Sequence, residues 1–182
     1  HTLHETKEGG NYQVKDPEKL IRIAKEWGVE TEGKDIYALA HEMAEIGLID
    51  VDSHNFPNLA LMKISAYHKA KGDNVEWCLP FKHYDIVYQS KVFDDTYSKD
   101  IDYFPMADKI IKGGTGYGLE NNLPYEIEHI YPDYSLYAET NIDVENTAYG
   151  FLTRGCPRAC DFCIVAKKEG RKSYKVADLS EF

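Results

Sequence analysis

The 182-residue sequence lacks any run of about 20 apolar residues, the length that a membrane-spanning helix requires. Its first residues, HTLHETKEGGNYQ, also lack the basic segment followed by an apolar run that marks a secretory signal peptide. These absences predict a soluble globular chain with no membrane partner, and the cytoplasm is its default location.

Cysteine is scarce and unevenly placed. The chain has four cysteines, and three of them, Cys156, Cys160 and Cys163, lie within eight residues. Such bunching is unlike the spread-out disulfide framework of a small secreted fold, and in a reducing compartment it more often binds metal. The fourth, Cys78, stands in the strand-like stretch VEWCLP, where we expect it to pack in the core.

Basic residues are also in short supply, which argues against a general nucleic-acid binder. The chain has 21 Lys and Arg against 31 Asp and Glu, a net charge of -10. Residues 150–175 are the exception, because seven basic and two acidic residues give them +5 and leave -15 for the rest. This basic segment suits thiolates, an anionic cluster or an anionic cosubstrate, although a solvated lysine-rich helix end explains residues 167–175 equally well.

The pattern of apolar residues and breakers predicts an α/β fold. Two capped amphipathic stretches, 16–28 and 35–47, predict a short N-terminal helical hairpin. A buried strand at Ile46 to Val51 and a helix from Pro57 to Gly72 follow. Further strands are predicted at 74–80, 84–93 and 107–114. Short strands alternating with a helix favour a Rossmann-like parallel sheet.

We divide the chain into a helical segment at 1–45, a Rossmann-like domain at 46–140 and a C-terminal unit at 147–182. In the last unit, TAYGFLTRG is strand-like, and FCIVAKKEG begins as a helix does. The cysteines therefore lie in a loop between a strand and a helix. Three thiolates in such a short loop can converge on one inorganic centre.

The stretch RGCPRACDFC, with Phe162 before its last cysteine, closely resembles the cluster loop of the radical S-adenosylmethionine (radical SAM) superfamily. This resemblance implies that Cys156, Cys160 and Cys163 bind three irons of a [4Fe-4S] cluster, with Phe162 beside it. The fourth iron binds S-adenosylmethionine, which is cleaved reductively to a 5'-deoxyadenosyl radical. A flavodoxin or ferredoxin is the implied electron donor, while the substrate stays open.

Residues 46–139 resemble the cobalamin-binding-type domain that precedes the barrel in many radical SAM proteins. We do not expect cobalamin itself. The cobalt-binding D-x-H-x-x-G loop is matched by Asp52, Ser53 and His54, but Pro57 stands where the glycine belongs. Partial matches to the other cobalamin-binding elements are spaced too closely; these matches are Ser90 in SKV and the glycine pair that begins at Gly113.

Two alternatives to the cluster remain open. A zinc-stabilised binding module needs a fourth ligand such as His129, because the sequence has no second C-x2-C pair. A purely structural α/β interaction domain needs none of the cysteines. The stretch GGTGYG at 113–118 could cradle a phosphate, but Pro124 breaks the helix that should follow, so a glycine-rich turn is the preferred interpretation.

Residues 1–45 resemble a helical piece of anaerobic nickel-iron carbon monoxide dehydrogenases, without any of that family's cluster cysteines. The join within EMAEIGLIDVD suggests a fusion, a chimeric assembly or a remodelled gene. A radical SAM barrel needs roughly 200 residues, whereas 19 follow Cys163. We therefore expect a truncated barrel, inactive alone, with a separate chain as the partner that supplies the rest.

Overall fold

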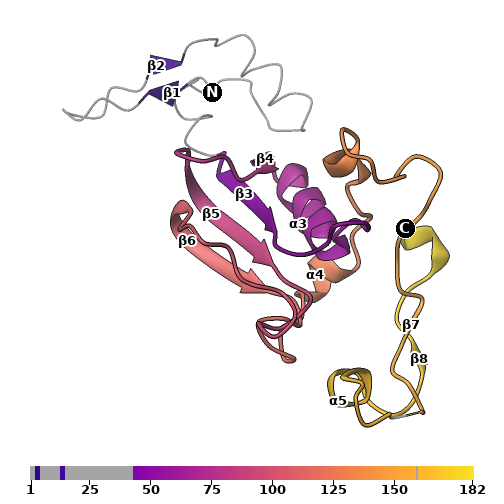
Figure 1. Ribbon diagram of the computed structural model, residues 1–182. Coiled ribbons are helices and arrows are strands. Elements are labelled where there is room, and N and C mark those ends of the chain that lie inside the picture. Colours follow the sequence, from indigo (N-terminus) through magenta and orange to yellow (C-terminus); the bar gives the residue numbers. More distant parts are fainter. Residues whose placement is uncertain (1–2, 5–12, 15–42, 159) are drawn as a thin grey trace.

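Four parallel strands form the central sheet of the computed structural model, which describes residues 3–4, 13–14, 43–158 and 160–182 (Figure 1). The strands lie in the order β4-β3-β5-β6. Their bounds are β3 Glu45–Asp50, β4 Asn74–Trp77, β5 His83–Ser90 and β6 Met106–Gly113. All four predicted strands are present, and the α/β class with a parallel sheet is confirmed.

The first strand of this sheet begins at Glu45, one residue before the predicted start at Ile46. Residues 45–47 belong to β3, so the prediction that a helix continues to Gly47 is wrong there, and the rest of the predicted hairpin lies outside the described residues. A Cβ at Gly47 would lie 3.0 Å from Cγ2 of Val87 and 3.1 Å from the ring of Tyr84. Glycine at this position therefore allows close packing against β5. Gly47 does not end a helix, although its place in the sequence suggested that role.

Helix α3 (Leu59–Ala70) connects β3 to β4 and covers one face of the sheet (Figure 1). Asn58 caps it, because its side-chain oxygen accepts a hydrogen bond from the N–H of Leu61 at 3.3 Å. Gly72, with a φ of 87°, ends the helical segment in the left-handed region that glycine tolerates best. The predicted helix is thus confirmed, and it starts two residues after Pro57.

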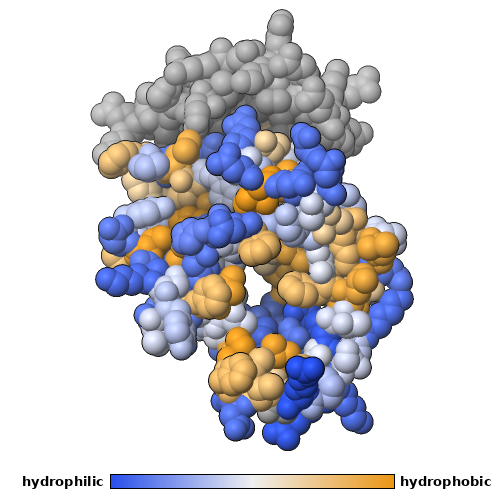
Figure 2. Space-filling model, turned by 45° about the vertical axis from the view of Figure 1, so that its right-hand side comes forward, coloured by the Kyte–Doolittle hydropathy of each residue, from blue (hydrophilic) through white to orange (hydrophobic). Residues whose placement is uncertain are grey.

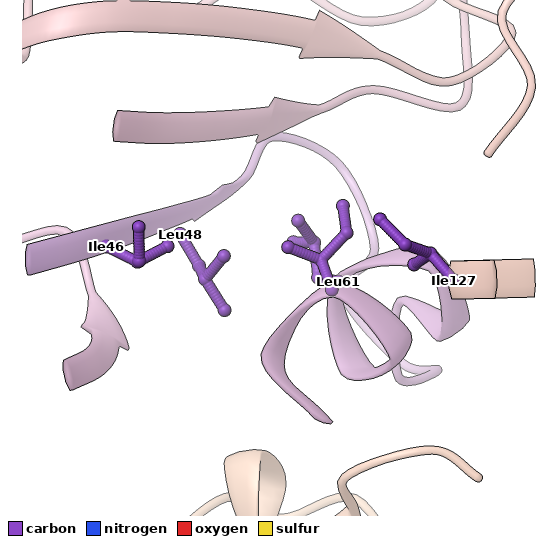
Figure 3. Packing of buried hydrophobic residues seen from close by; sticks show 5 residues of the cluster. Ile46, Leu48, Leu61 and Ile127 are labelled. Carbon is purple, nitrogen blue, oxygen red and sulfur yellow. The ribbon is translucent and has the colours of Figure 1, made fainter. Parts of the chain in front are cut away.

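The main core lies between β3 and α3 (Figure 3). Ile46 and Leu48 point from the strand toward Leu61 and Ile64 of the helix, and Ile127 from α4 (Tyr125–Glu128) joins them. Removing each of these side chains from water contributes about 1.5 to 3 kcal/mol, so this cluster is the main source of stability for the sheet and helix.

A smaller cluster lies on the opposite face of the sheet. Ile49, Tyr84 and Val87 are buried there, and Cys78 and Ile101 pack against them from the loops after β4 and β5. The prediction that Cys78 packs in the core is confirmed, because its side chain is half-buried against this cluster. Among the described residues, the loops after β4 and β5 supply these covering side chains.

The remaining described elements are short. Strand β1 (Leu3–His4) pairs antiparallel with β2 (Gln13–Val14). The C-terminal segment, residues 150–182, runs beside α3 and α4 (Figure 1). It contains β7 (Thr153–Arg154), α5 (Val165–Lys168), β8 (Tyr174–Lys175) and a final 3-10 helix, Leu179–Glu181. A second 3-10 helix spans Tyr134–Tyr137. Within the described ranges, none of the helices is both long and apolar enough to cross a bilayer.

Candidate functional site

The three clustered cysteines lie in one loop of the C-terminal segment. Strand β7 (Thr153–Arg154) precedes the loop and pairs antiparallel with β8 (Tyr174–Lys175), while the short helix α5 (Val165–Lys168) follows the last cysteine. Cys156 and Cys163 are half-buried, Cys160 is exposed, and all three are free thiols. The predicted order of strand, cysteine loop and helix is present, although the strand has two residues and the helix four.

Backbone hydrogen bonds hold the first end of this loop and form a turn within its second half. The N–H of Cys156 donates to the carbonyl of Gly170 at 3.2 Å, and the N–H of Cys163 donates to the carbonyl of Cys160 at 3.0 Å. Gly155 has a φ of 81°, and a Cβ there would lie 2.1 Å from the carbonyl oxygen of Lys172. The glycine before the first cysteine therefore lets the two arms of the segment meet.

Arg154 connects the loop to the body of the protein. Its guanidinium donates to Glu128 of α4 at 3.1 Å and to Glu169, just after α5, at 2.8 Å. Burial alone would raise the pKa of the Glu169 carboxyl, but hydrogen bonds from the Gly155 N–H and from Arg154 outweigh burial and hold that pKa below its ordinary value. Glu169 is thus an ionised anchor for the start of the loop.

The residues of the loop fit a site in which three thiolates ligate one cluster, because three free cysteine sulfurs lie within one turn-rich loop. In the part of the chain that the structure describes, no three His, Cys, Asp or Glu side chains are grouped as metal ligands. The sulfurs therefore have to move together to bind a centre. Phe162 is 91% exposed, so its ring is available to pack over whatever the loop holds.

His129, the candidate fourth zinc ligand, is engaged elsewhere. Its Nδ1 lies 2.9 Å from a carboxylate oxygen of Glu181, and its ring packs on Tyr125 with centroids 4.4 Å apart. These contacts tie the last turn of the chain to α4. The structure does not bring His129 together with the cysteines as a ligand set among the described residues.

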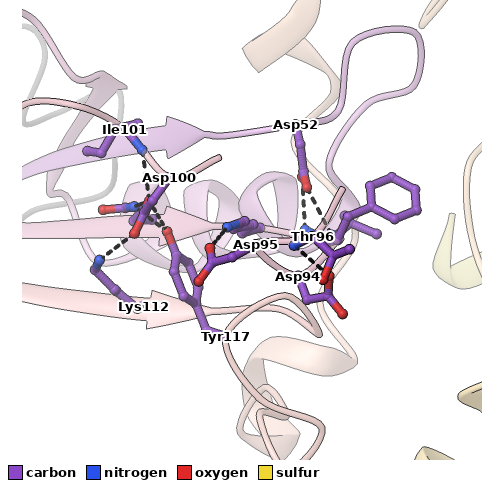
Figure 4. Close-up of polar contacts among 12 residues, drawn as sticks. Asp52, Asp94, Asp95, Thr96, Asp100, Ile101, Lys112 and Tyr117 are labelled. Carbon is purple, nitrogen blue, oxygen red and sulfur yellow. Dashed lines mark hydrogen bonds and ion pairs between the residues drawn. The ribbon is translucent and has the colours of Figure 1, made fainter. Parts of the chain in front are cut away.

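The loop that partly matches a cobalt-binding motif has a structural role in this fold. Both carboxylate oxygens of the buried Asp52 accept backbone N–H bonds, from Val92 at 2.8 Å and from Phe93 at 2.9 Å (Figure 4). His54 is exposed, and the hydroxyl of Ser90 accepts a hydrogen bond from the Asn58 amide at 2.9 Å. Asp52 and Ser90 thus position the loops that follow β3 and β5.

The glycine-rich stretch forms a tight turn after β6. The N–H of Gly116 donates to the carbonyl of Lys91 at 2.9 Å, and a Cβ at Gly114 would lie 2.2 Å from that same oxygen. The hydroxyl of Thr115 donates to the carbonyl of Val92 at 2.6 Å. These contacts favour the turn interpretation over a phosphate cradle, because groups that would face an anion are bonded to the neighbouring loop.

A cleft of about 1090 Å³ opens at the carboxyl ends of β5 and β6. The first half of α3, the turn after β6 and helix α4 form three of its walls. The C-terminal segment closes the fourth with Phe151, Arg154, Ile164 and Val165, and Figure 2 shows the surface hollowed on this side of the molecule. Since Ile164 directly follows Cys163, the cysteine loop adjoins the cleft.

A polar network around Asp100 fixes the base of this region (Figure 4). Its carboxylate accepts from Lys112 at 2.8 Å, from the Tyr117 hydroxyl and from the Gln89 amide, both at 2.5 Å. Burial alone would raise the pKa of Asp100, but the hydrogen bonds from Lys112 and Tyr117 outweigh burial and hold the pKa at about 2. The network joins the strand ends of β5 and β6 to the loop between them.

We expect Asp100→Asn to remove an acid-dependent part of the stability. The pKa of Asp100 falls from 3.8 to about 2 on folding, so the native state binds fewer protons between these values. The advantage of the unmodified chain over the variant should be complete above about pH 4 and should decline as the pH approaches 2. Urea midpoints of both chains across this range test the prediction, and a pH-independent difference would contradict it.

Several residues of this region gave no signal in the sequence. Lys63 and Glu128 resemble ordinary charged positions on amphipathic helices, and Asp100 lies in an acidic loop with no motif. Burial and partners far along the chain give them their importance, as with the Glu128 carbonyl, which accepts from Lys63. The apolar neighbours of Lys63, Met62 and Ile64, gave no hint of its burial, because adjacent residues of a helix face different directions.

Searches of protein-family models, curated proteins and solved structures found no match to this chain.

Proposed function

We propose that Cys156, Cys160 and Cys163 bind a [4Fe-4S] cluster of the radical SAM type, with one iron left for S-adenosylmethionine. The observation that carries this proposal is the grouping of three free thiols in one loop, whose first end is held by a backbone hydrogen bond and whose last residues form a hydrogen-bonded turn. Three protein ligands leave one iron of such a cluster open to a small molecule.

Local charge supports the same assignment. Residues 150–175 carry a net charge of +5 in a chain of -10. Positive surroundings favour the thiolate form of cysteine, which is the form that ligates metal. Because Arg154 is already paired with two glutamates, the remaining positive charge of this segment comes from residues such as Arg158 and Lys167, which lie at exposed positions.

Each part of the loop has a distinct role in this proposal. Gly155 and Cys156 form the fixed end, because Glu169 and Gly170 accept their N–H groups. Cys160 is exposed, so its sulfur would have to turn toward the other two to complete the ligand set, and the exposed ring of Phe162 would be available to pack beside the bound group. When bound, the cluster supplies the electron for reductive cleavage of S-adenosylmethionine to a 5'-deoxyadenosyl radical, with a flavodoxin or ferredoxin as donor.

Anaerobic reconstitution with iron and sulfide tests the proposal directly. We expect broad visible absorbance and about four irons per chain, since three cysteines are the protein ligands of one cubane. Tight binding of one zinc without iron would overturn the proposal in favour of a zinc-stabilised module. Uptake of neither metal would favour a purely structural role for the loop. Formation of 5'-deoxyadenosine from S-adenosylmethionine after chemical reduction is a separate measurement of turnover.

A further inference from the structure

The cleft beside the cysteine loop has the position and walls of a small-molecule site. In open sheets of parallel strands, ligands bind outside the carboxyl ends of the strands where the strand order reverses, and this sheet reverses between β3 and β5. Apolar side chains form much of the wall, among them Val92, Phe151 and Ile164, which are 43%, 55% and 45% exposed. A volume of about 1090 Å³ accommodates a molecule of several rings.

Lys63 brings a positive charge into this apolar space. It is 2% exposed, and its Nζ donates to the backbone carbonyl of Glu128 while lying 5.3 Å from the centroid of the Phe182 ring. Burial lowers the pKa of this amine, although the more distant charges of Glu128 and Glu181 partly compensate. A buried ammonium whose direct partner is a neutral oxygen is costly, and an anion beside it would offset that cost.

The other basic groups of the cleft differ in whether their partners are carboxylates or neutral oxygens. Arg154 is paired with two glutamates, and Lys112 is paired with Asp100. Lys168 donates only to neutral oxygens, the carbonyls of Leu119 and Asn121 at 2.8 and 3.0 Å. In the described residues, neither Lys63 nor Lys168 has a carboxylate within 4.0 Å. Among the described residues, the cleft therefore has two lysine ammonium groups whose direct hydrogen-bond partners are neutral backbone oxygens, and the carboxylates around them compensate their charge only from a distance.

We propose that this cleft binds a small amphipathic anion, a molecule with an apolar ring or chain and one acidic group. The apolar part lies against the exposed side chains of the wall, such as Phe151 and Ile164, and the acidic group lies beside Lys63. This assignment goes beyond the cluster proposal and does not depend on it, because none of the residues that carry it is a cysteine.

Paired fluorescent probes test the charge requirement. The anionic probe 8-anilinonaphthalene-1-sulfonate and the neutral N-phenyl-1-naphthylamine share the same rings and differ by the sulfonate. We expect the anionic probe to saturate at about one per folded chain and to bind about tenfold more tightly than the neutral one, since a hydrogen bond to a charged group is worth this factor. Equal affinities, or no saturable binding, would overturn the proposal.

Three variants locate the site. Lys63→Met keeps the length and shape of the side chain but removes its charge, and should weaken the anionic probe about tenfold while leaving the neutral probe unchanged. Phe151→Glu places a negative charge at a 55% exposed position of the wall and should weaken the anionic probe without disturbing the core. Phe104→Glu, at a 94% exposed position outside the cleft, is the matched control.

Each outcome decides the question. If Lys63→Met does not fold, the comparison of Phe151→Glu with Phe104→Glu decides alone, because both positions are exposed. Anionic-probe affinity that is the same in Phe151→Glu and Phe104→Glu would overturn the site. A chain with all three loop cysteines replaced by serine should still bind the anionic probe. The cluster proposal can therefore fail without affecting the test of the anion site.

Discussion

Replacing Cys160 with serine should reduce the iron of the reconstituted chain from about four per chain to below about one. Iron–sulfur clusters select soft thiolate ligands, and a serine hydroxyl is a much poorer ligand for them. Cys156→Ser and Cys163→Ser should have the same effect, because all three sulfurs are needed to hold three irons. Iron and acid-labile sulfide analysis, together with the visible spectrum, measures the loss.

Cys78→Ser is the internal control for this series. Cys78 is half-buried against Tyr84 and Val87, and burial, with a smaller effect of the Glu76 charge, raises the pKa of its thiol. Such a thiol stays protonated and is a poor ligand, so the variant should load iron as the unmodified chain does. Equal loss in Cys78→Ser and the loop variants would show non-specific thiol chemistry and contradict a cluster in the loop.

The sheet was predictable because its elements carry local signals. Ile46 to Ile49 form a short apolar run, and Pro57 and Gly72 delimit the helix that follows. These signals depend on residues close together in the chain. For that reason the sequence was sufficient to predict the four strands, the helix and the α/β class.

Features that depend on distant residues could not be predicted. The predicted strand from Ile46 to Val51 already contained Gly47, but only the approach of Val87 and Tyr84 shows why a glycine stands at this position. The strand order β4-β3-β5-β6 likewise follows from pairing between segments about 40 residues apart, as in the register of Ile46 with Ile86. Local patterns do not specify such pairing.

The same distinction applies to the candidate site. The cysteine loop was found because its residues are adjacent, whereas the cleft is built from α3, the ends of β5 and β6, α4 and the C-terminal segment. Lys63 and Glu128 meet only because α3 and α4 pack together, 65 residues apart. The spacing of the three cysteines identifies the loop, but it does not give the relative positions of their sulfur atoms, which depend on the fold of the loop and on a bound metal.

Leu61→Ala should lower the free energy of unfolding by about 3 kcal/mol, within a usual range of roughly 2 to 5 kcal/mol. Leu61 is fully buried between β3 and α3, where it packs with Ile46 and Leu48. Alanine removes three carbon atoms and leaves a cavity that the sheet and helix close only in part. Urea unfolding followed by circular dichroism gives the value.

Leu179→Ala is the matched control, because Leu179 is 71% exposed and its truncation should change the free energy of unfolding by no more than about 0.5 kcal/mol. Similar small effects at both positions would show that the sheet and α3 do not form the stabilising core. A large decrease in the free energy of unfolding for Leu61→Ala, with unchanged iron loading in the folded variant, would show that the core and the cysteine loop act independently. The core then determines whether the chain folds, and the cysteine loop determines which centre it holds.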